Sequence, residues 1–429
     1  MKIFKVLILI LCCISGVHTQ DSIVIANITA IPLHINKVYK NVDVEIIEGF
    51  VSRISDHKGF EEIPDTYLTI DGTGKFLIPS FGDAHGHLPD SNRLELYGLM
   101  QLAHGVTSVR SMRGKEWHIK HRNRYSPTPT YYLGSPPVSR RQSYSAEKID
   151  SLGKIYGEAG FDFVKVLSVA DSSTFYSWVK SCLDHNLFLA GHCPRNIGPF
   201  RAAETMMFAS IEHLSGVLQV SSLDELYRVI EMTKDRSVFH CPTMDWYFTG
   251  QVIEDTLANK PGLQYIATEK LNTWEEKVDE YYKESTSESR ETSRAKEKAN
   301  FDVRLGYLKL IYENGGLTVV SPDASGIYGV PGFDYQRELQ HFSTAGIPPR
   351  DILTAASLNY AKMTERKQFP SWGTIKVGSR ANLLILTANP LENINAVDYI
   401  ETIIISGEVL SRTSILEKMD RLNQSLKGG

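Results

Sequence analysis

Two histidines separated by a single residue are the first feature of this sequence that could do chemistry. His85 and His87 lie at the end of the apolar run 76–84. Because side chains two residues apart on a strand point to the same side, both imidazoles would enter one site together. Imidazole nitrogens are ligands for zinc and other divalent transition metals. A His-x-His pair is a weak signal alone, so its weight depends on where other candidate ligands fall.

Four further residues of this kind are associated with apolar runs elsewhere in the chain. His192, His213 and Asp323 each follow such a run within two residues. Lys165 lies in the middle of another run, although lysines are rarely buried without a partner. Each residue taken singly has a structural explanation, such as a hydrogen-bonded core histidine or a lysine that reaches solvent. Their shared position at strand ends favours one common site.

The elements that would position these residues are eight strand-like apolar runs that alternate with helix-length segments. Continuous apolar strands between helices are typical of a parallel sheet covered on both faces. Eight of them over this length predict an α/β fold with a (β/α)8 TIM-like barrel, whose strand ends converge on one rim. The runs are 76–84, 106–110, 130–133, 163–167, 187–190, 207–212, 237–240 and 317–321.

Short β-branched runs at both ends of the chain predict a second, smaller domain. We expect residues 22–78 and 371–415 to form a composite β-sandwich around a barrel that spans residues 79–365. Residues 255–314 read as a helical insertion rich in Glu, Lys and Ser. A solvated extension is the preferred interpretation, and a role as a lid or rim stays open.

The composition is that of a globular protein. The 429 residues include 46 basic and 50 acidic side chains, so the net charge is −4. A slightly acidic chain lacks the field that holds nucleic acid, so no nucleic-acid partner is expected.

The first 19 residues predict a cleavable signal peptide. Lys2 and Lys5 precede the apolar run 6–14, which ends in small and polar residues. This run is far shorter than the roughly 20 residues that span a bilayer. We therefore expect a secreted or periplasmic protein without a membrane anchor, in which Cys182, Cys193 and Cys241 form no disulfide framework.

Lys165 would join a metal site only after a chemical change, because an ammonium group cannot bind a cation. Burial disfavours the charged form and lowers a lysine pKa by up to about 3–5 units. The neutral amine could take up carbon dioxide and become a carbamate. Such a group offers two oxygens and could bridge two metal ions about 3.5–4 Å apart.

With these residues in place, the chain resembles the amidohydrolase superfamily, in particular its imidazolonepropionase-related, Xaa-Pro dipeptidase-like branch with a carboxylated lysine. The resemblance covers essentially all of the chain after the signal peptide. It rests on short motifs around the candidate ligands and on a series of motifs in the tail. The motifs lie at 78–87, 105–110, 163–167, 191–192, 211–213, 323–324, 338–339, 345–347, 353–359, 373–375, 381–383, 389–391 and 405–407.

The resemblance implies a hydrolase with two divalent metal ions, for which we expect zinc. By position, His85 and His87 would hold the first ion together with Asp323. His192 and His213 would hold the second, and carbamylated Lys165 would bridge both. A hydroxide between the ions would attack the substrate carbonyl, and Asp323 would carry its proton to the leaving nitrogen.

The leading hypothesis is thus an exported metal-dependent amidohydrolase that cleaves dipeptides of the Xaa-Pro type or N-acyl amino acids. Hydrolysis of a cyclic amide, lactone or phosphotriester on the same metal site is the alternative, followed by a binding protein on a decayed barrel. The partner is a small molecule or short peptide, and a homo-oligomer stays open. His104, Arg110 and His240 also lie near strand ends, where structural hydrogen bonding and substrate contact both stay open, and Cys193 reads as packing.

Overall fold

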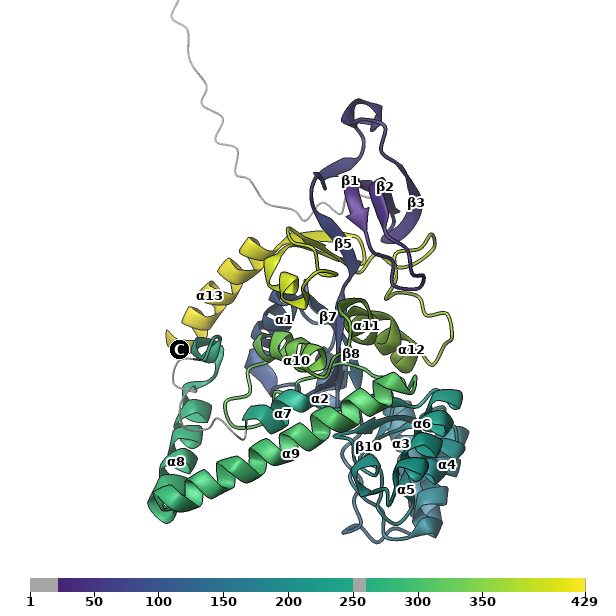
Figure 1. The fold of residues 1–429 in the computed structure, drawn as a ribbon, viewed down its shortest axis with the longest axis vertical. Coiled ribbons are helices and arrows are strands. Elements are labelled where there is room, and N and C mark those ends of the chain that lie inside the picture. Colours follow the sequence, from purple (N-terminus) through teal and green to yellow (C-terminus); the bar gives the residue numbers. More distant parts are fainter. Residues whose placement is uncertain (1–21, 250–259, 429) are drawn as a thin grey trace, which may run out of the picture.

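The computed structural model describes residues 22–249 and 260–428, whose helices and strands form a mixed α/β protein (Figure 1). The predicted signal peptide, residues 1–19, lies outside the described residues, and so do residues 255–259 of the predicted insertion. Among the helices of the described part, none has the length and apolar character needed to cross a membrane.

One large sheet contains strands from both ends of the chain. Its order is β15-β14-β13-β5-β1-β2-β3, and β4 pairs with β1. Ile25, Val44 and Ile385 are fully buried in its shared core. The two-sheet sandwich stays a prediction. The strands are β1 (Ser22–Ala30), β2 (Tyr39–Ile47), β3 (Phe50–Asp56), β4 (Leu68–Asp71), β5 (Phe76–Pro79), β13 (Leu383–Leu386), β14 (Ile400–Ile405) and β15 (Glu408–Ser411).

The C-terminal end of the chain contains a helix that the sequence did not reveal. After β15 the chain forms α13 (Arg412–Gly428), which packs against α1 (Leu94–Ala103). Arg412 anchors the start of α13, because its Nε donates to the carbonyl oxygen of Ala103 over 2.8 Å. This contact joins the C-terminal segment to the region that carries the candidate site.

Two parallel sheets hold seven of the eight predicted central strands. The first has the order β6-β7-β8, and the second has the order β12-β11-β10-β9. They are connected where Ser135 N donates to the carbonyl oxygen of Phe163 over 2.8 Å. The strands are β6 (Phe81–Gly86), β7 (Val106–Ser111), β8 (Thr130–Leu133), β9 (Val164–Val166), β10 (Leu189–Gly191), β11 (Phe208–Glu212) and β12 (Phe239–Cys241).

Residues 317–321, the eighth predicted strand, carry only an isolated bridge rather than a continuous strand. Their backbone still forms hydrogen bonds with a neighbouring strand on each side. His240 N donates to the carbonyl oxygen of Leu317 over 2.8 Å, and Ala84 N donates to that of Val320 over 3.1 Å. This extended segment therefore lies between β12 and β6. The closed eight-stranded barrel stays a prediction.

Helices cover the parallel sheets, and their boundaries follow ordinary helix signals. In α4 (Ser172–Asp184) the predicted apolar face Phe175, Trp178 and Cys182 is buried, and the Asp171 carboxylate caps the first turn by accepting from Thr174 N. The remaining helices before the insertion are α2 (Glu116–His121), α3 (Ala146–Ala159), α5 (Gly198–Glu204), α6 (Leu223–Asp235) and α7 (Met244–Thr249). Those after it are α10 (Phe333–Thr344), α11 (Pro349–Thr354) and α12 (Tyr360–Glu365).

The described part of the predicted insertion is helical. It forms α8 (Thr268–Glu284) and the long α9 (Ser287–Glu313), which crosses the molecule and packs against α7 and α10 (Figure 1). Phe301, Leu308 and Ile311 are buried along the C-terminal half of α9. The charged N-terminal half is solvated, whereas the C-terminal half lies next to the strand ends.

Candidate metal centre

All six predicted ligands line one cavity of about 250 Å³. His85 lies on β6 and His87 directly follows it, while Lys165 is the middle residue of β9. The other three follow the ends of β10, β11 and the segment 317–321; they are His192, His213 and Asp323. The carboxyl ends of parallel strands lie at one edge of a sheet, which explains why residues so distant in sequence meet there.

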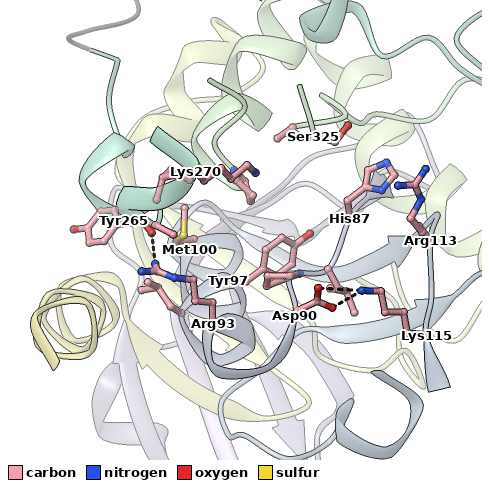
Figure 2. Close-up of a pocket in the computed structure, with 17 residues that line it drawn as sticks. His87, Asp90, Arg93, Tyr97, Met100, Arg113, Lys115, Tyr265, Lys270 and Ser325 are labelled. Atoms are coloured by element: carbon pink, nitrogen blue, oxygen red, sulfur yellow. Dashed lines mark hydrogen bonds and ion pairs between the residues drawn. The ribbon is translucent and has the colours of Figure 1, made fainter. Parts of the chain in front are cut away.

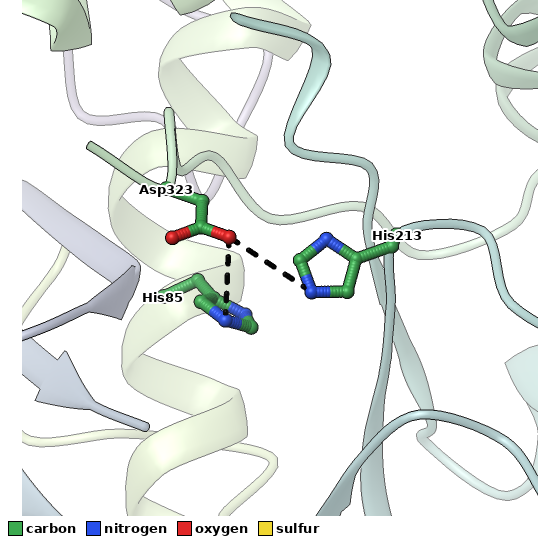
Figure 3. A group of neighbouring side chains, drawn as sticks. All are labelled: His85, His213 and Asp323. Carbon is green, nitrogen blue, oxygen red and sulfur yellow. Dashed lines mark ion pairs between the residues drawn. The ribbon is translucent and has the colours of Figure 1, made fainter. Parts of the chain in front are cut away.

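The carboxylate of Asp323 faces three imidazoles in this cavity, and Figure 3 shows two of them, those of His85 and His213. Its Oδ1 lies 3.3 Å from His87 Nε2, and its Oδ2 lies 3.7 Å from His85 Nε2 and 3.9 Å from His213 Nε2. The ring centroids of His85 and His213 are only 4.6 Å apart. His213 is thus almost as close to Asp323 as His85 is, although the resemblance assigned it to a separate metal ion.

The orientation of His85 is fixed by a hydrogen bond with Glu212 that the sequence analysis missed. Its Nδ1 lies 2.7 Å from Glu212 Oε2, so Nε2 is left to face the cavity. Arg110 Nη2 donates to Glu212 Oε1 over 2.7 Å, and the other donors of Arg110 bond Ser210 Oγ and the carbonyl oxygen of Ala84. Burial alone would raise the pKa of Glu212, but Arg110 and then His85 hold it well below its usual range.

His213 is held by contacts with two residues from different elements, Thr243 and Arg304. Its Nδ1 lies 2.7 Å from Thr243 Oγ1, which leaves Nε2 free to face Asp323. Arg304 of α9 donates to the His213 carbonyl oxygen over 3.0 Å, and its guanidinium carbon lies 3.4 Å from the ring centroid of Tyr247. Both His213 and Asp323 have positive φ angles, 60° and 47°. The helical insertion therefore supports a strained turn that carries a candidate ligand.

His192 reaches the cavity because glycine precedes it. Gly191 has a φ of 137°, and a Cβ at this position would lie 2.1 Å from the carbonyl oxygen of Val166. Only glycine allows β10 to approach β9 so closely at this bend. The ring centroid of His192 lies 4.9 Å from that of His213.

Lys165 is the buried amine that the sequence predicted. It is 3% exposed and lines the cavity together with the histidines. Within residues 22–249 and 260–428, its Nζ has no hydrogen bond or ion pair. Burial lowers the pKa of Lys165 to about 8, against a smaller opposing effect of Glu212. About a tenth of the side chain is therefore a neutral amine at pH 7, far more than for a lysine with the ordinary pKa.

The protonation states in the cavity suit cation binding. Burial and, next, the charge of Lys165 lower the pKa of His85 and of His192 to about 4. Burial would raise the pKa of Asp323, but His85 and His87 hold it below its usual range. Neutral imidazoles and an ionised carboxylate are the forms that bind a metal.

The donor set therefore fits divalent metal ions. Ligand atoms of His85, His213 and Asp323 all lie within 4.8 Å of one another. Two of the histidines use their other ring nitrogen for a fixed contact, with Glu212 and with Thr243, which is the usual way of orienting a metal-binding imidazole. His85, Glu212 and Cys241 form a second such group, but its carboxylate is already bonded to Arg110.

Other residues near the strand ends have structural roles. His240 is fully buried, and its Nε2 lies 3.0 Å from Thr233 Oγ1. His104 is buried with its Nδ1 2.8 Å from the Met100 carbonyl oxygen. Cys193 is a buried free thiol within an apolar cluster. None of these three, nor Arg110, is among the residues that line the metal cavity in the described part of the chain.

Sequence reasoning missed Glu212, Thr243 and the two aromatic rings of α7 that line the cavity, Trp246 and Tyr247. Glu212 had a usable signal, because it is the one charged residue in the apolar run 207–212. Thr243 and the α7 aromatics had none, since they lie beyond the end of β12 without a regular spacing.

No protein-family model matches this sequence, and no curated protein matches it either. Solved structures do match. Bottromycin amidohydrolase superposes with a TM-score of 0.75 at 18% identity, covering 96% of this chain and 92% of that chain. A Xaa-Pro dipeptidase with bound methionine matches with a TM-score of 0.68 at 14% identity, over 91% and 100% of the two chains. The A. niger ochratoxinase matches with a TM-score of 0.64 at 17% identity, over 91% and 96%.

At these identities the similarity establishes the fold. The chain has the fold of amidohydrolase-type proteins, which confirms the predicted superfamily resemblance at the level of the fold. The finer branch, the metal ions and the carboxylated lysine stay predictions.

Proposed function

We propose that this protein is a metal-dependent hydrolase of C–N amide bonds that acts on dipeptides or N-acyl amino acids. One observation carries the proposal: the Asp323 carboxylate faces the Nε2 atoms of His85, His87 and His213 in a cavity that Lys165 and His192 also line. The amidohydrolase-type fold supports it. On this basis we also infer a closed (β/α)8 barrel whose eighth strand is the segment 317–321.

The residues that would hold two divalent ions, zinc by preference, are the six cavity residues His85, His87, Lys165, His192, His213 and Asp323. Ions of this kind polarise a carbonyl oxygen and make hydroxide available at neutral pH. Lys165 would contribute as a carbamate: its neutral amine forms an N–C bond to carbon dioxide and releases one proton. The lowered pKa of its amine supports this step.

Asp323 is the candidate proton carrier. Its two oxygens face different histidines, and Ser325 Oγ donates to Oδ1 over 2.7 Å. This arrangement keeps the carboxylate ionised, ready to accept a proton from the attacking water and pass it to the leaving nitrogen. Trp246 and Tyr247 line the same cavity and would help to exclude bulk water.

Hydrolysis by zinc-loaded protein in bicarbonate tests the proposal. We expect release of free amino acid from a panel of dipeptides and N-acyl amino acids, and we expect chelation, His85→Ala and Lys165→Ala each to abolish it. His185→Ala is the matched control, because His185 pairs with Asp150 at the end of α4, and it should retain full activity. Activity that is indifferent to chelator and to His85→Ala would contradict the proposal.

We further propose export through residues 1–19. N-terminal sequencing of the mature protein tests this, since a mature chain that still begins at Met1 would exclude cleavage.

A further inference from the structure

A second, larger cavity opens beside the metal cavity. It measures about 420 Å³, and His87, Arg113 and Ser325 line both cavities (Figure 2). Because these shared residues place the two spaces next to each other, a molecule cleaved in the smaller one can extend into the larger one. The volume is within the range of small-molecule sites, about 300–1,000 Å³.

Apolar side chains form much of the wall of the larger cavity. Leu96, Tyr97 and Met100 of α1 are 1%, 5% and 3% exposed, and Ile266, just before α8, is 7% exposed. Tyr97 lies centrally among the lining residues (Figure 2). Such a wall stabilises a large apolar or aromatic group by burying its surface.

The charged residues of the larger cavity are mostly basic. Lys115 is paired with Asp90 over 2.7 Å, and Arg93 Nη1 donates to the Tyr265 carbonyl oxygen over 3.2 Å (Figure 2). The side chains of Arg113 and Lys270 have no hydrogen bond or ion pair within residues 22–249 and 260–428. Lys270 lies over the Trp274 ring, 4.8 Å from its centroid, and lines only the larger cavity, whereas Arg113 lies beside His87 and lines both cavities (Figure 2). An unpaired guanidinium at the junction of two cavities is suited to a carboxylate, which it can bind through two hydrogen bonds.

We propose that Arg113 binds the α-carboxylate of the substrate's C-terminal residue and that the larger cavity holds the side chain of that residue. The inference rests on the proposed function. In a dipeptide or N-acyl amino acid only the Cα atom separates the scissile nitrogen from the carboxylate carbon, so the carboxylate must lie next to the metal cavity, where Arg113 is. A proline ring or a glycine would leave most of the larger cavity empty. The preferred substrates are therefore N-acyl derivatives of phenylalanine and other large apolar residues.

Acetate release from N-acetylphenylalanine and from its carboxamide tests the role of Arg113. In the wild type the acid should have a kcat/KM roughly 30- to 100-fold above that of the carboxamide, as expected for hydrogen bonds between charged groups. Arg113→Gln should lower kcat/KM for the acid by roughly that factor more than for the carboxamide, so that the preference for the acid disappears. Arg228→Gln, an exposed arginine of α6, is the control and should change neither rate. A variant Arg113→Gln that keeps the preference for the acid would overturn the inference.

A narrowed cavity tests the side-chain preference. Ala267 is a half-buried lining residue directly before α8, so Ala267→Phe would fill part of the space. We expect the ratio of kcat/KM for N-acetylphenylalanine to kcat/KM for N-acetylglycine to fall by roughly 10-fold or more. Equal losses on both substrates, or a wild-type preference for N-acetylproline or N-acetylglycine, would refute the assignment.

Binding to metal-free protein separates this inference from the proposed function. Calorimetry with phenylalanine should give a dissociation constant that Arg113→Gln raises at least about 10-fold, the effect of about 1.4 kcal/mol. If metal-loaded protein hydrolyses no amide while phenylalanine still binds through Arg113, the proposed function fails and the subsite stands. If the carboxamide is hydrolysed but phenylalanine binding is indifferent to Arg113→Gln, the subsite fails alone.

Discussion

The two adjoining cavities are built from different kinds of structure. The metal cavity takes its six candidate ligands from strands and strand ends, and an ion pair between the fully buried Arg110 and Glu212 supports one of them. The larger cavity is lined by the loop after β6, by α1 and by the start of α8. Regular, buried elements thus position the chemistry, while loops and an insertion shape the space for the substrate. Changes to the first should cost stability, whereas changes to the second should alter specificity.

The largest loss on the metal-cavity side is expected for Glu212→Gln. This change leaves the Arg110 guanidinium buried without its charge partner and frees His85 Nδ1. Breaking one side of a buried pair costs about 3–5 kcal/mol. Chemical denaturation should show this loss in the free energy of unfolding, and Glu204→Gln, an exposed control on α5, should show almost none. A loss below about 1 kcal/mol would mean that the pair does not support the site.

The next largest loss of stability is expected for Gly191→Ala. The added methyl group would meet the Val166 carbonyl oxygen, and the backbone conformation itself is unfavourable for alanine. Strain of this kind costs about 1–3 kcal/mol, and the displaced His192 should weaken zinc binding in a chelator competition. Gly74→Ala is the matched control: Gly74 also has a positive φ, 74°, but open space around its Cβ position. If both variants lose equally, the close approach of β10 to β9 has no role of its own.

Stability should also depend on pH through two buried histidines, His104 and His240. Burial lowers the pKa of His104 and of His240 to about 4, from an ordinary value of 6.5. Because the folded-state pKa lies below the unfolded one, their contribution is complete above pH 6.5 and is lost as the pH falls toward 4. Protonation of each of these histidines should lower the free energy of unfolding by about 2 kcal/mol between pH 7 and pH 4.5. The free energy of unfolding of His104→Asn should differ less between the two pH values than that of the wild type. If the difference is the same in both proteins, His104 does not contribute to the pH dependence.

The smallest effect is expected at the contact between the insertion and the metal cavity. Arg304→Ala removes the bond to the His213 carbonyl oxygen and the stacking on Tyr247, which together should cost about 1–2 kcal/mol. Lys296→Ala, on the exposed part of α9, is the control. Thermal unfolding of both variants tests whether α9 supports the cavity. A lower melting temperature for Arg304→Ala than for Lys296→Ala is expected, whereas equal melting temperatures would indicate that the insertion is only a solvated extension.

The six candidate ligands could be placed together from the sequence, whereas the residues of the adjoining cavity could not, for a physical reason. Parallel strands bring their carboxyl ends to one edge, so a residue at the end of an apolar run can be placed without knowing the loops. His85, His192 and His213 were placed in this way. Arg113, Met100 and Ile266 come together only through the path of a loop and the packing of an insertion, which no local period encodes.

Two features of the fold could not be predicted from local sequence patterns. Residues 317–321 are extended and bonded on both sides but too irregular to form a continuous strand. The partners of Glu212 lie on β6 and β7, so the buried pair depends on tertiary packing that appears only when the sheets are assembled. The sequence shows Glu212 as a charge in an apolar run, but it does not show that His85 and Arg110 are its partners.

Metal stoichiometry tests the central claim most directly. Protein loaded with zinc in bicarbonate and then desalted should retain two zinc ions per chain by elemental analysis. His85→Ala and Lys165→Ala should each retain fewer, and His185→Ala should retain both. Wild-type protein that retains no zinc, or variants that retain as much as the wild type, would contradict a metal centre formed by these side chains.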